Sequence, residues 1–368
     1  MMRIVAVQTG LQADSVLGGE ITDREFLTRL ADRGVEVHVL AAEDREIVRH
    51  DNVVPHYHKR RFYKRVPYSR NLDVAIALRS LLADLGHVDW VRFNSPYAVG
   101  IGTVLAARGH RIWGSYLHCE DYPVWRWIDS WLPKHCDLVT CLGEDTRRDL
   151  VARCPAADRP STVVVPLGID TEPGAAAVPP RQEIRDQLGF AESDVVVLFA
   201  GLAIPRKGIA DLTAAWGRLG NHNAARLLII SQPVATHESR LIAELTHGDP
   251  RVRHLARVPH ELMPAYFRAS DIFLFPTHRE GFGLVVGEAM ASGLPVVTTR
   301  AHGVREVVRE NETALLAEVG DVEQLTAQLR RLVQGPELRK QLGMAGRRRV
   351  EQVFQWDAII DGLCALLR

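Results

Sequence analysis

The chain has 368 residues, of which 46% are hydrophobic and 24% charged, so neither a disordered chain nor a disulfide scaffold is indicated. This length fits two α/β domains of similar size, each able to bury its own core. The 45 Lys and Arg residues balance the 45 Asp and Glu residues, which argues against a protein that coats nucleic acid through its overall charge.

The first half of the chain alternates short apolar runs with helical patterns, which is typical of a parallel sheet. Strands are expected at residues 3–9, 35–42, 90–94, 111–118, 137–142 and 162–166, with helices near 20–32 and 71–85. We therefore expect a first Rossmann-like domain over residues 1–171.

A segment rich in Pro, Ala and Gly follows at residues 172–182 and predicts a linker. The alternation resumes in a second domain over residues 183–352. Strands are expected there at 195–200, 227–231, 252–258, 271–276, 295–299 and 314–317. Residues 353–368 are expected to form a helix that packs back on the first domain.

Ligands of doubly wound sheets bind beyond the carboxyl ends of the strands, so the loops that follow these ends are the first candidates for a site. In the second half these are the loops after Ala200, Pro276 and Thr299. We expect the site to lie in a cleft between the two domains.

The strongest local signal is the run THREGFGLVVGEAMASGLPVV, in which a Gly-rich turn follows a strand and a helix begins near Gly283. The N–H groups of Gly283 and Leu284, together with the positive end of the helix dipole, favour a bound phosphate. Glu288 is the one charged residue of this helix, and a ribose diol is a suitable partner for its carboxylate. On spacing alone, a capping role for Glu280 and a surface position for Glu288 explain the pattern equally well.

A second signal is the run FAGLAIPRKGIADL, where Arg206 and Lys207 stand between a strand and the next helix. A departing nucleoside diphosphate gathers negative charge, which Arg, Lys and backbone donors must meet when no metal is present. On its own, the tetrapeptide Pro-Arg-Lys-Gly at residues 205–208 is better explained as a solvated turn. Next to the helix start at Gly283, the phosphate interpretation is favoured.

These residues resemble glycosyltransferase family 4, of GT-B architecture, over essentially the whole chain. The resemblance rests on Glu280, seven residues and then Glu288, followed by EAMASGLPVV and HGVREVV. It implies an α/β fold of two Rossmann-like doubly wound domains facing across a cleft. It also implies a metal-independent, retaining transfer of a sugar from a nucleotide sugar to an acceptor, with no cofactor.

The resemblance also implies individual roles. Glu280 is expected to contact the donor sugar and Glu288 the ribose. The diphosphate is expected to contact Arg206, Lys207 and the amides of Phe282, Gly283 and Leu284, and the base is expected to contact Arg257 and Val258. Gly18 and Gly19, in the loop after the first strand, are expected to lie near the diphosphate on its N-terminal side. His118, at a strand end, is expected to reach the donor sugar.

Some of these assignments have ordinary structural alternatives. Gly18 and Gly19 are equally consistent with a flexible turn, and a single histidine at a strand end, such as His118, is more often structural. Two positions depart from the family pattern. Leu202 stands where the family usually has an Arg after the glycine Gly201, so either Arg206 takes over its phosphate contact or the donor is held more weakly. Leu167 stands where the family commonly has an Asn before the glycine of the crossover strand.

The sequence gives no rule for the donor base. A UDP-sugar is favoured, with GDP-mannose next. The same donor site fits a nucleotide-sugar epimerase of this architecture or a non-catalytic partner subunit. No metal is expected, because the His56 and His58 pair lacks further spaced ligands.

Residues 56–70, HYHKRRFYKRVPYSR, combine six Lys and Arg residues with four aromatic ones and no acid. Such residues support contact with anionic lipid, although a solvated loop or a grip on a soluble anionic acceptor is at least as consistent. No nucleic-acid module surrounds this segment, so nucleic-acid binding is not expected. Five cysteines without a C-x-x-C pair suit the cytosol, and no stretch reaches membrane-spanning length. We therefore expect a cytoplasmic protein, with peripheral contact at the inner membrane face as a hypothesis.

Overall fold

The computed structural model describes residues 1–7, 18–43, 47, 49–59, 70–94, 96–117, 119, 123–171, 179–220, 225–232 and 234–368. The contacts within the chain divide it into two compact units. The first unit combines Met1–Leu167 with Asp357–Arg368, and the second is Gly168–Trp356.

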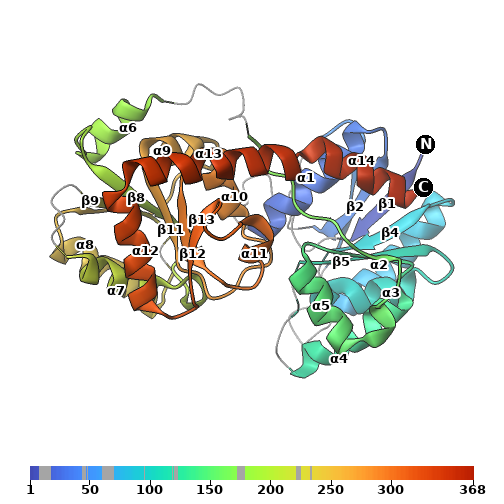
Figure 1. Cartoon of the computed structure of the whole chain (residues 1–368). Helices are drawn as coiled ribbons and strands as arrows, with labels where there is room; N and C mark the ends of the chain where they lie inside the picture. The colour runs from blue at the N-terminus through green and yellow to red at the C-terminus, as the bar shows by residue number, and fades with distance from the viewer. Residues whose placement is uncertain are drawn as a thin grey trace. The chain divides into compact units, whose positions relative to one another are not determined.

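The first unit contains a seven-stranded parallel sheet of order β3-β2-β1-β4-β5-β6-β7 (Figure 1). Its strands are β1 (Arg3–Val7), β2 (Glu36–Ala42), β3 (Val53–His58), β4 (Trp90–Phe93), β5 (Arg111–Tyr116), β6 (Leu138–Cys141) and β7 (Thr162–Val164). Its helices include α1 (Gly18–Asp32), α2 (Arg70–Leu85), α3 (Ile101–Ala106), α4 (Pro123–Trp131) and α5 (Glu144–Arg153). The strand order reverses between β1 and β4, which is the switch point of this sheet.

Two features of this unit differ from the sequence-based expectation. Gly18 and Gly19 are the first residues of α1 and do not lie in a loop. Strand β3 was not predicted, because its six residues VVPHYH include two His residues, one Tyr and a proline. Since β3 is an edge strand paired only with β2, it needs just one row of hydrogen-bond partners and tolerates Pro55.

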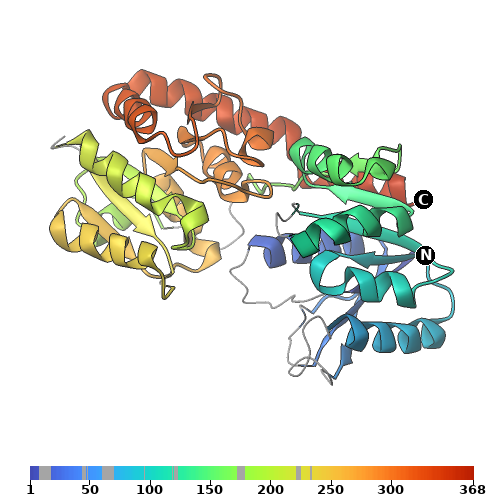
Figure 2. The ribbon, with the colours of Figure 1, turned by 90° about the horizontal axis from the view of Figure 1, so that it is seen from below.

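The second unit contains a six-stranded parallel sheet of order β10-β9-β8-β11-β12-β13. Its strands are β8 (Val195–Ala200), β9 (Ala225–Ile230), β10 (Val252–Leu255), β11 (Ile272–Phe275), β12 (Val296–Thr299) and β13 (Ala314–Ala317). Its helices are α6 (Arg181–Leu188), α7 (Ile209–Leu219), α8 (His237–Gly248), α9 (Met263–Ala269), α10 (Leu284–Ala291), α11 (Val304–Val307), α12 (Val322–Gln334) and α13 (Pro336–Val353). Helices α7, α8 and α12 cover one face of the sheet, while α9, α10 and α13 lie on the other (Figures 1 and 2).

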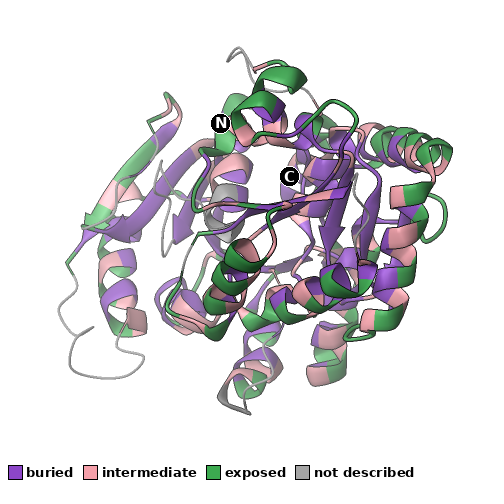
Figure 3. Cartoon of the chain, turned by 90° about the vertical axis from the view of Figure 1, so that its left-hand side faces the viewer, coloured by how far each residue is buried: buried purple, intermediate pink, exposed green. Residues whose placement is uncertain are grey.

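Both sheets are doubly wound, as predicted, and their strands form the cores. Figure 3 shows the strands as mostly buried, with exposed residues on the outer faces of the helices. Because strands covered on both faces need apolar side chains on both, runs such as IFLF in β11 are fully buried.

The last helix, α14 (Trp356–Leu367), packs on the first unit. The buried indole of Trp90 donates its Nε1–H to the Leu367 carbonyl at 2.8 Å. Arg33 forms ion pairs with Asp357 at 2.6 Å and with Asp361 at 2.8 Å. Residues distant in sequence thereby complete the first unit.

Candidate functional site

Two loops of the second unit meet where the neighbouring strands β8 and β11 end. The turn η4 (Pro205–Lys207) lies in the loop after β8, and residues 276–283 follow β11. The main-chain N–H of His278 donates to the Arg206 carbonyl at 2.8 Å, which joins the two loops. Since the strand order reverses between β8 and β11, the loops lie at the switch point where doubly wound sheets bind ligands.

The Glu280 carboxylate joins the two cations that the sequence singled out. Lys207 Nζ lies 2.7 Å from Glu280 Oε1, and Arg206 Nη1 lies 3.2 Å from Glu280 Oε2. The side chains of Lys207 and Glu280 are only 13% and 10% exposed, whereas that of Arg206 is 45% exposed. Within this cluster of three side chains, two positive charges face one negative charge.

Lys207 sits in a site that weakens its hold on a proton. Burial lowers the pKa of its ammonium group from the usual lysine value, and the positive charge of Arg206 acts in the same direction. The negative charge of Glu280 opposes this shift. The ammonium also lies 5.1 Å from the centre of the Phe275 ring. A cation with little surrounding water interacts strongly with an incoming anion.

Thr277 is a contact that sequence reasoning missed. It is fully buried, and its Oγ1 lies 2.7 Å from Glu280 Oε1 and 2.9 Å from the Arg206 carbonyl oxygen. The hydroxyl carries one proton, so it donates to one of these oxygens at a time. Its signal in the sequence is a polar residue just past the buried strand β11.

Gly208 fixes the turn that carries the two cations. Its φ is +70°, a left-handed conformation that side chains disfavour. A Cβ at this position would lie 1.8 Å from the Pro276 carbonyl oxygen. The absence of a side chain therefore lets the loop after β8 approach the loop after β11 closely.

Helix α10 begins where predicted, with Gly283 at its N-cap in the left-handed region at φ +89°. The N–H groups of a helix's first turn have no carbonyl partner within the helix. The Phe282 side chain is buried and packs edge-on against Phe354, with 5.5 Å between ring centroids. Phe282 therefore offers a ligand its backbone and not its ring.

Glu288 lies on α10 with 24% of its side chain exposed. Burial raises the pKa of its carboxyl group, with His260 opposing this shift and Asp170 adding to it. His260 belongs to η5 (His260–Leu262), and its Nε2 lies 4.0 Å from Glu288 Oε1. Sequence reasoning missed His260, because the separation of His260 and Glu288 in the sequence does not show that the two side chains are neighbours in the fold.

Arg257 and Val258 lie between β10 and η5, and Pro259 separates them from His260. Arg257 is exposed and Val258 is buried. The strand expected at 252–258 ends earlier, at Leu255, so both residues lie in a loop. The sequence segment assigned to the base is thus close to the acid assigned to the ribose.

Other predicted residues are not brought into this cluster by any described contact. His118 lies outside the described residues. Gly18 and Gly19 belong to the first unit. Leu202 is half-buried and Leu167 is buried. Within the described ranges, no group of three or more His, Cys, Asp or Glu residues is arranged to hold a metal ion.

Two family models match the chain. One, described as glycosyl transferases group 1, matches residues 180–349. The other, described as Glycosyltransferase Family 4, matches residues 17–173.

Individual proteins show the same likeness. D-inositol 3-phosphate glycosyltransferase of Geodermatophilus obscurus is 33% identical over 242 residues, 62% of this chain and 52% of that protein, so the chain spans about half of that relative's length. A GDP-mannose-dependent monoacylated alpha-(1-6)-phosphatidylinositol monomannoside mannosyltransferase of Corynebacterium glutamicum is 27% identical over 297 residues, 76% of this chain and 75% of that protein.

Among solved structures, sucrose-phosphate synthase of Thermosynechococcus elongatus has a TM-score of 0.86 at 22% identity, covering 100% of this chain and 98% of that one. The likeness shows that the chain has the GT-B fold. Since the two family models together match most of both units, the chain belongs to glycosyltransferase family 4.

Proposed function

We propose that the protein is a glycosyltransferase that moves a hexose from a nucleotide sugar to an acceptor, with retention of anomeric configuration and without a metal ion. One observation carries the proposal: Arg206 and Lys207 both contact Glu280 at the adjoining ends of β8 and β11. Membership of family 4 supports the reaction class.

The charges of this cluster suit a leaving diphosphate. As the bond between sugar and phosphate breaks, negative charge grows on the phosphate oxygens, and Lys207 and Arg206 stabilise it. The N–H groups at the start of α10 add further donors without needing to reorganise. Glu280 holds the two cations in place before the donor arrives and is the carboxylate that we assign to the donor sugar.

The nucleoside part of the donor is assigned to Glu288 in the middle of α10 and to the loop after β10. Glu288, as a carboxylate, accepts hydrogen bonds from the two ribose hydroxyls. We assign the base to the loop containing Arg257 and Val258, which leads to His260, the neighbour of Glu288. The Corynebacterium relative is named as GDP-mannose-dependent, which supports GDP-mannose as a donor beside the UDP-sugar that we expected first.

The decisive experiment is a titration of the purified protein with UDP, GDP and ADP, followed by the matching sugar nucleotides with and without candidate acceptors. We expect UDP or GDP to bind at least tenfold more tightly than ADP. We also expect nucleotide release to depend on an acceptor. Conversion of the donor into an isomeric nucleotide sugar would instead indicate an epimerase, and binding without turnover a non-catalytic subunit. Absence of nucleotide binding would remove the proposal.

We also propose that the protein is cytoplasmic and contacts the inner membrane face through residues 56–70. No helix in the described part of the chain is long and apolar enough to cross a membrane. Residues 60–69 lie outside the described residues, while His56 and His58 lie on the edge strand β3. Tyr57 between them is 51% exposed.

The membrane proposal predicts cosedimentation with phosphatidylglycerol vesicles at low salt. Each basic residue near an anionic surface contributes about 1 kcal/mol, so a Lys64→Ala, Arg65→Ala double variant should lose about 2 kcal/mol and bind roughly thirtyfold more weakly. Neutral phosphatidylcholine vesicles are the control. Equal sedimentation of the two proteins would contradict a role for this segment.

A further inference from the structure

A row of hydrogen-bonded side chains crosses strands β1, β2 and β3 at the edge of the first sheet. Arg3 Nε lies 2.9 Å from Glu36 Oε2, and Glu36 Oε1 lies 3.0 Å from His38 Nε2. His38 Nδ1 lies 2.8 Å from His56 Nε2. The four side chains share one face of the sheet, because Arg3 is paired with Glu36, and Leu40, two residues after His38, is paired with His56. None of the donor assignments uses this row.

The positions of the protons in this row follow from its chemistry. The hydrogen bond from Arg3 holds the pKa of the Glu36 carboxyl group below its usual value, so Glu36 is a carboxylate that only accepts. His38 therefore donates from Nε2. A neutral imidazole carries one proton, so Nδ1 of His38 accepts and Nε2 of His56 donates. Both rings are neutral in this state.

The bond between the two imidazole rings survives one added proton and not two. The first proton gives one imidazolium ion, which still faces a lone pair of the other ring. When both rings are protonated, both facing nitrogens carry hydrogen, and neither can accept at 2.8 Å. Burial lowers the pKa of His56, and the positive charge of His38 acts in the same direction. The second proton is therefore the unfavourable one.

The groups around the pair come from the strands and from the helices packed on them. Helix α2 covers this face, since its Val74 and Leu78 form one buried cluster with Val5 and Leu40 of β1 and β2. Among the described residues, the ring nitrogens of His38 bond only Glu36 and His56. The described charged and titratable groups of the neighbouring elements are Arg3 on β1, Glu36 on β2, His58 on β3, Arg70, Asp73, Arg79 and Asp84 on α2, and Asp23, Arg24, Glu25, Arg29 and Asp32 on α1, which also contacts β2 and β3.

The side-chain bond matters because β3 is an edge strand. Within the described chain, β3 pairs only with β2, so one backbone ladder and this bond hold it. Val54 and Tyr57 are 37% and 51% exposed, so they add little stabilisation by burial. Residues 56–58 of β3 are also the first residues of the segment 56–70. The bond between the rings therefore fixes the start of that segment in the sheet.

We propose that His38 and His56 form an acid-sensitive latch, which holds β3 against β2 near neutral pH and opens when both rings are protonated. In a detached strand, His56 has the ordinary histidine pKa of about 6.5. The pKa is lower in the paired strand, so the detached strand binds the proton more readily. The latch is therefore closed above the ordinary pKa and opens as the pH falls below it. It does not depend on the proposed transferase function.

The test follows β3 by hydrogen exchange in the whole protein, with mass spectrometry of its peptides at pH 8 and pH 5 and correction for the intrinsic exchange rates. We expect protection of the β3 amides to be about tenfold lower at pH 5, the effect of losing roughly one hydrogen bond. Long-range proton–nitrogen spectra of the imidazoles give a second measurement on the parent protein. At pH 8, both His38 and His56 should carry their proton on Nε2.

Three variants separate the latch from general acid sensitivity. His56→Gln keeps a side-chain N–H donor that does not titrate, so its β3 should remain protected at pH 5. His56→Leu has no donor, so its β3 should be weakly protected at both pH values. The matched control is His87→Gln, which replaces an 83% exposed histidine of the same unit and should keep the pH dependence of the parent.

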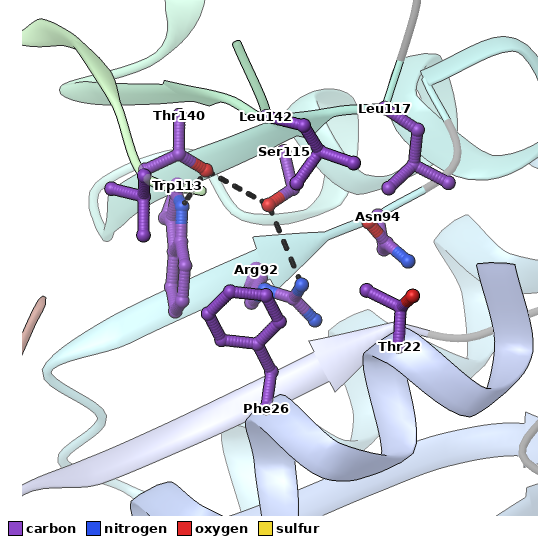
Figure 4. A pocket seen from close by; sticks show the side chains of 10 residues that line it. Thr22, Phe26, Arg92, Asn94, Trp113, Ser115, Leu117, Thr140 and Leu142 are labelled. Carbon is purple, nitrogen blue, oxygen red and sulfur yellow. Dashed lines mark hydrogen bonds between the residues drawn. The ribbon is translucent and has the colours of Figure 1, made fainter. Parts of the chain in front are cut away.

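A second polar row in the same sheet is the internal reference. Arg92 Nη2 donates to Ser115 Oγ at 3.4 Å, and Ser115 Oγ lies 2.9 Å from Thr140 Oγ1, across β4, β5 and β6 (Figure 4). Arg92 Nη1 also lies 2.6 Å from Asp23 Oδ1. Arginine, serine and threonine side chains keep their protons between pH 5 and pH 8. Protection of the β5 amides should therefore be equal at the two pH values.

Three outcomes of the exchange experiment would overturn the latch: unchanged protection of β3 at pH 5, an equal loss of protection in β3 and β5, or the same pH dependence in His56→Gln as in the parent. A proton found on Nδ1 of His38 at pH 8 would overturn it as well, because His56 would then not be the donor.

Discussion

Replacing Lys207 by alanine is expected to lower the rate of glycosyl transfer by about 10²–10³-fold while donor binding falls less. The ammonium is largely buried beside Glu280, so its charge acts at low local dielectric on the oxygens of the leaving diphosphate. Loss of one preorganised group that stabilises transition-state charge typically costs about 3–4 kcal/mol. Single-turnover kinetics at saturating donor would measure the effect on the chemical step.

The matched control is Lys340→Ala, which removes an exposed lysine from α13 of the same unit. It should transfer sugar at the parent rate. Thermal unfolding of Lys207→Ala should remain cooperative, because Arg206 still neutralises Glu280. A folded Lys207→Ala protein with full activity would remove Lys207 from the site.

The same residue sets an alkaline limit on activity. Lysine is charged below its pKa, and burial lowers the pKa of Lys207. In the ligand-free protein its charge is therefore lost at a lower pH than that of an ordinary lysine. We expect kcat/KM to fall on the alkaline side in the parent protein, and this limb should be absent from the residual activity of Lys207→Ala.

Replacing Glu288 by alanine is expected to weaken donor binding by about 10–100-fold, because a hydrogen bond to a charged group contributes about 1.5–3 kcal/mol. The discriminating measurement compares the preferred nucleoside diphosphate with its 2′-deoxy form. The parent protein should prefer the ribose form, and Glu288→Ala should bind both forms equally. Glu337→Ala, at an exposed position, should keep the parent preference. Retained discrimination by Glu288→Ala would assign the ribose to another residue.

Acidification should act through Glu288 as well. Burial raises the pKa of its carboxyl group, so protonation begins at a higher pH than for an ordinary glutamate. Since the carboxylate is the form that accepts both ribose hydrogen bonds, donor affinity should fall with decreasing pH in the parent. Affinity of the 2′-deoxy form should fall less.

The strands of both sheets could be predicted because covered parallel strands are continuous apolar runs, as in VVVLFA of β8. Edge strand β3 could not, since half of its residues face away from the core. Gly18 and Gly19 suggested a loop because glycine is a poor helix former. The end of β10 was predicted at Val258, but the strand ends at Leu255, because the apolar Val258 continues the sequence pattern beyond the last paired residue of the strand.

For the candidate site, the sequence predicted that the loops after β8 and β11 would matter, because parallel strands end at one edge. It did not predict that Lys207 and Glu280, 73 residues apart, would form an ion pair. Contacts across such separations depend on the fold and not on local pattern. The same holds for His260 beside Glu288 and for the pair of Arg92 with Asp23.

The docking of α14 has a consequence for biosynthesis. Domains usually fold as units while the ribosome is still working, with the N-terminal one first. Here the first unit cannot be completed first, because Met1–Leu167 forms one unit with Asp357–Arg368, which follow Gly168–Trp356 in the chain. Until that last helix is synthesised, Trp90 lacks the carbonyl that its indole contacts. A nascent chain that has released Gly168–Trp356 from the ribosome but not yet Asp357–Arg368 should therefore carry a completed second unit and a first unit that proteases and chaperones can still reach.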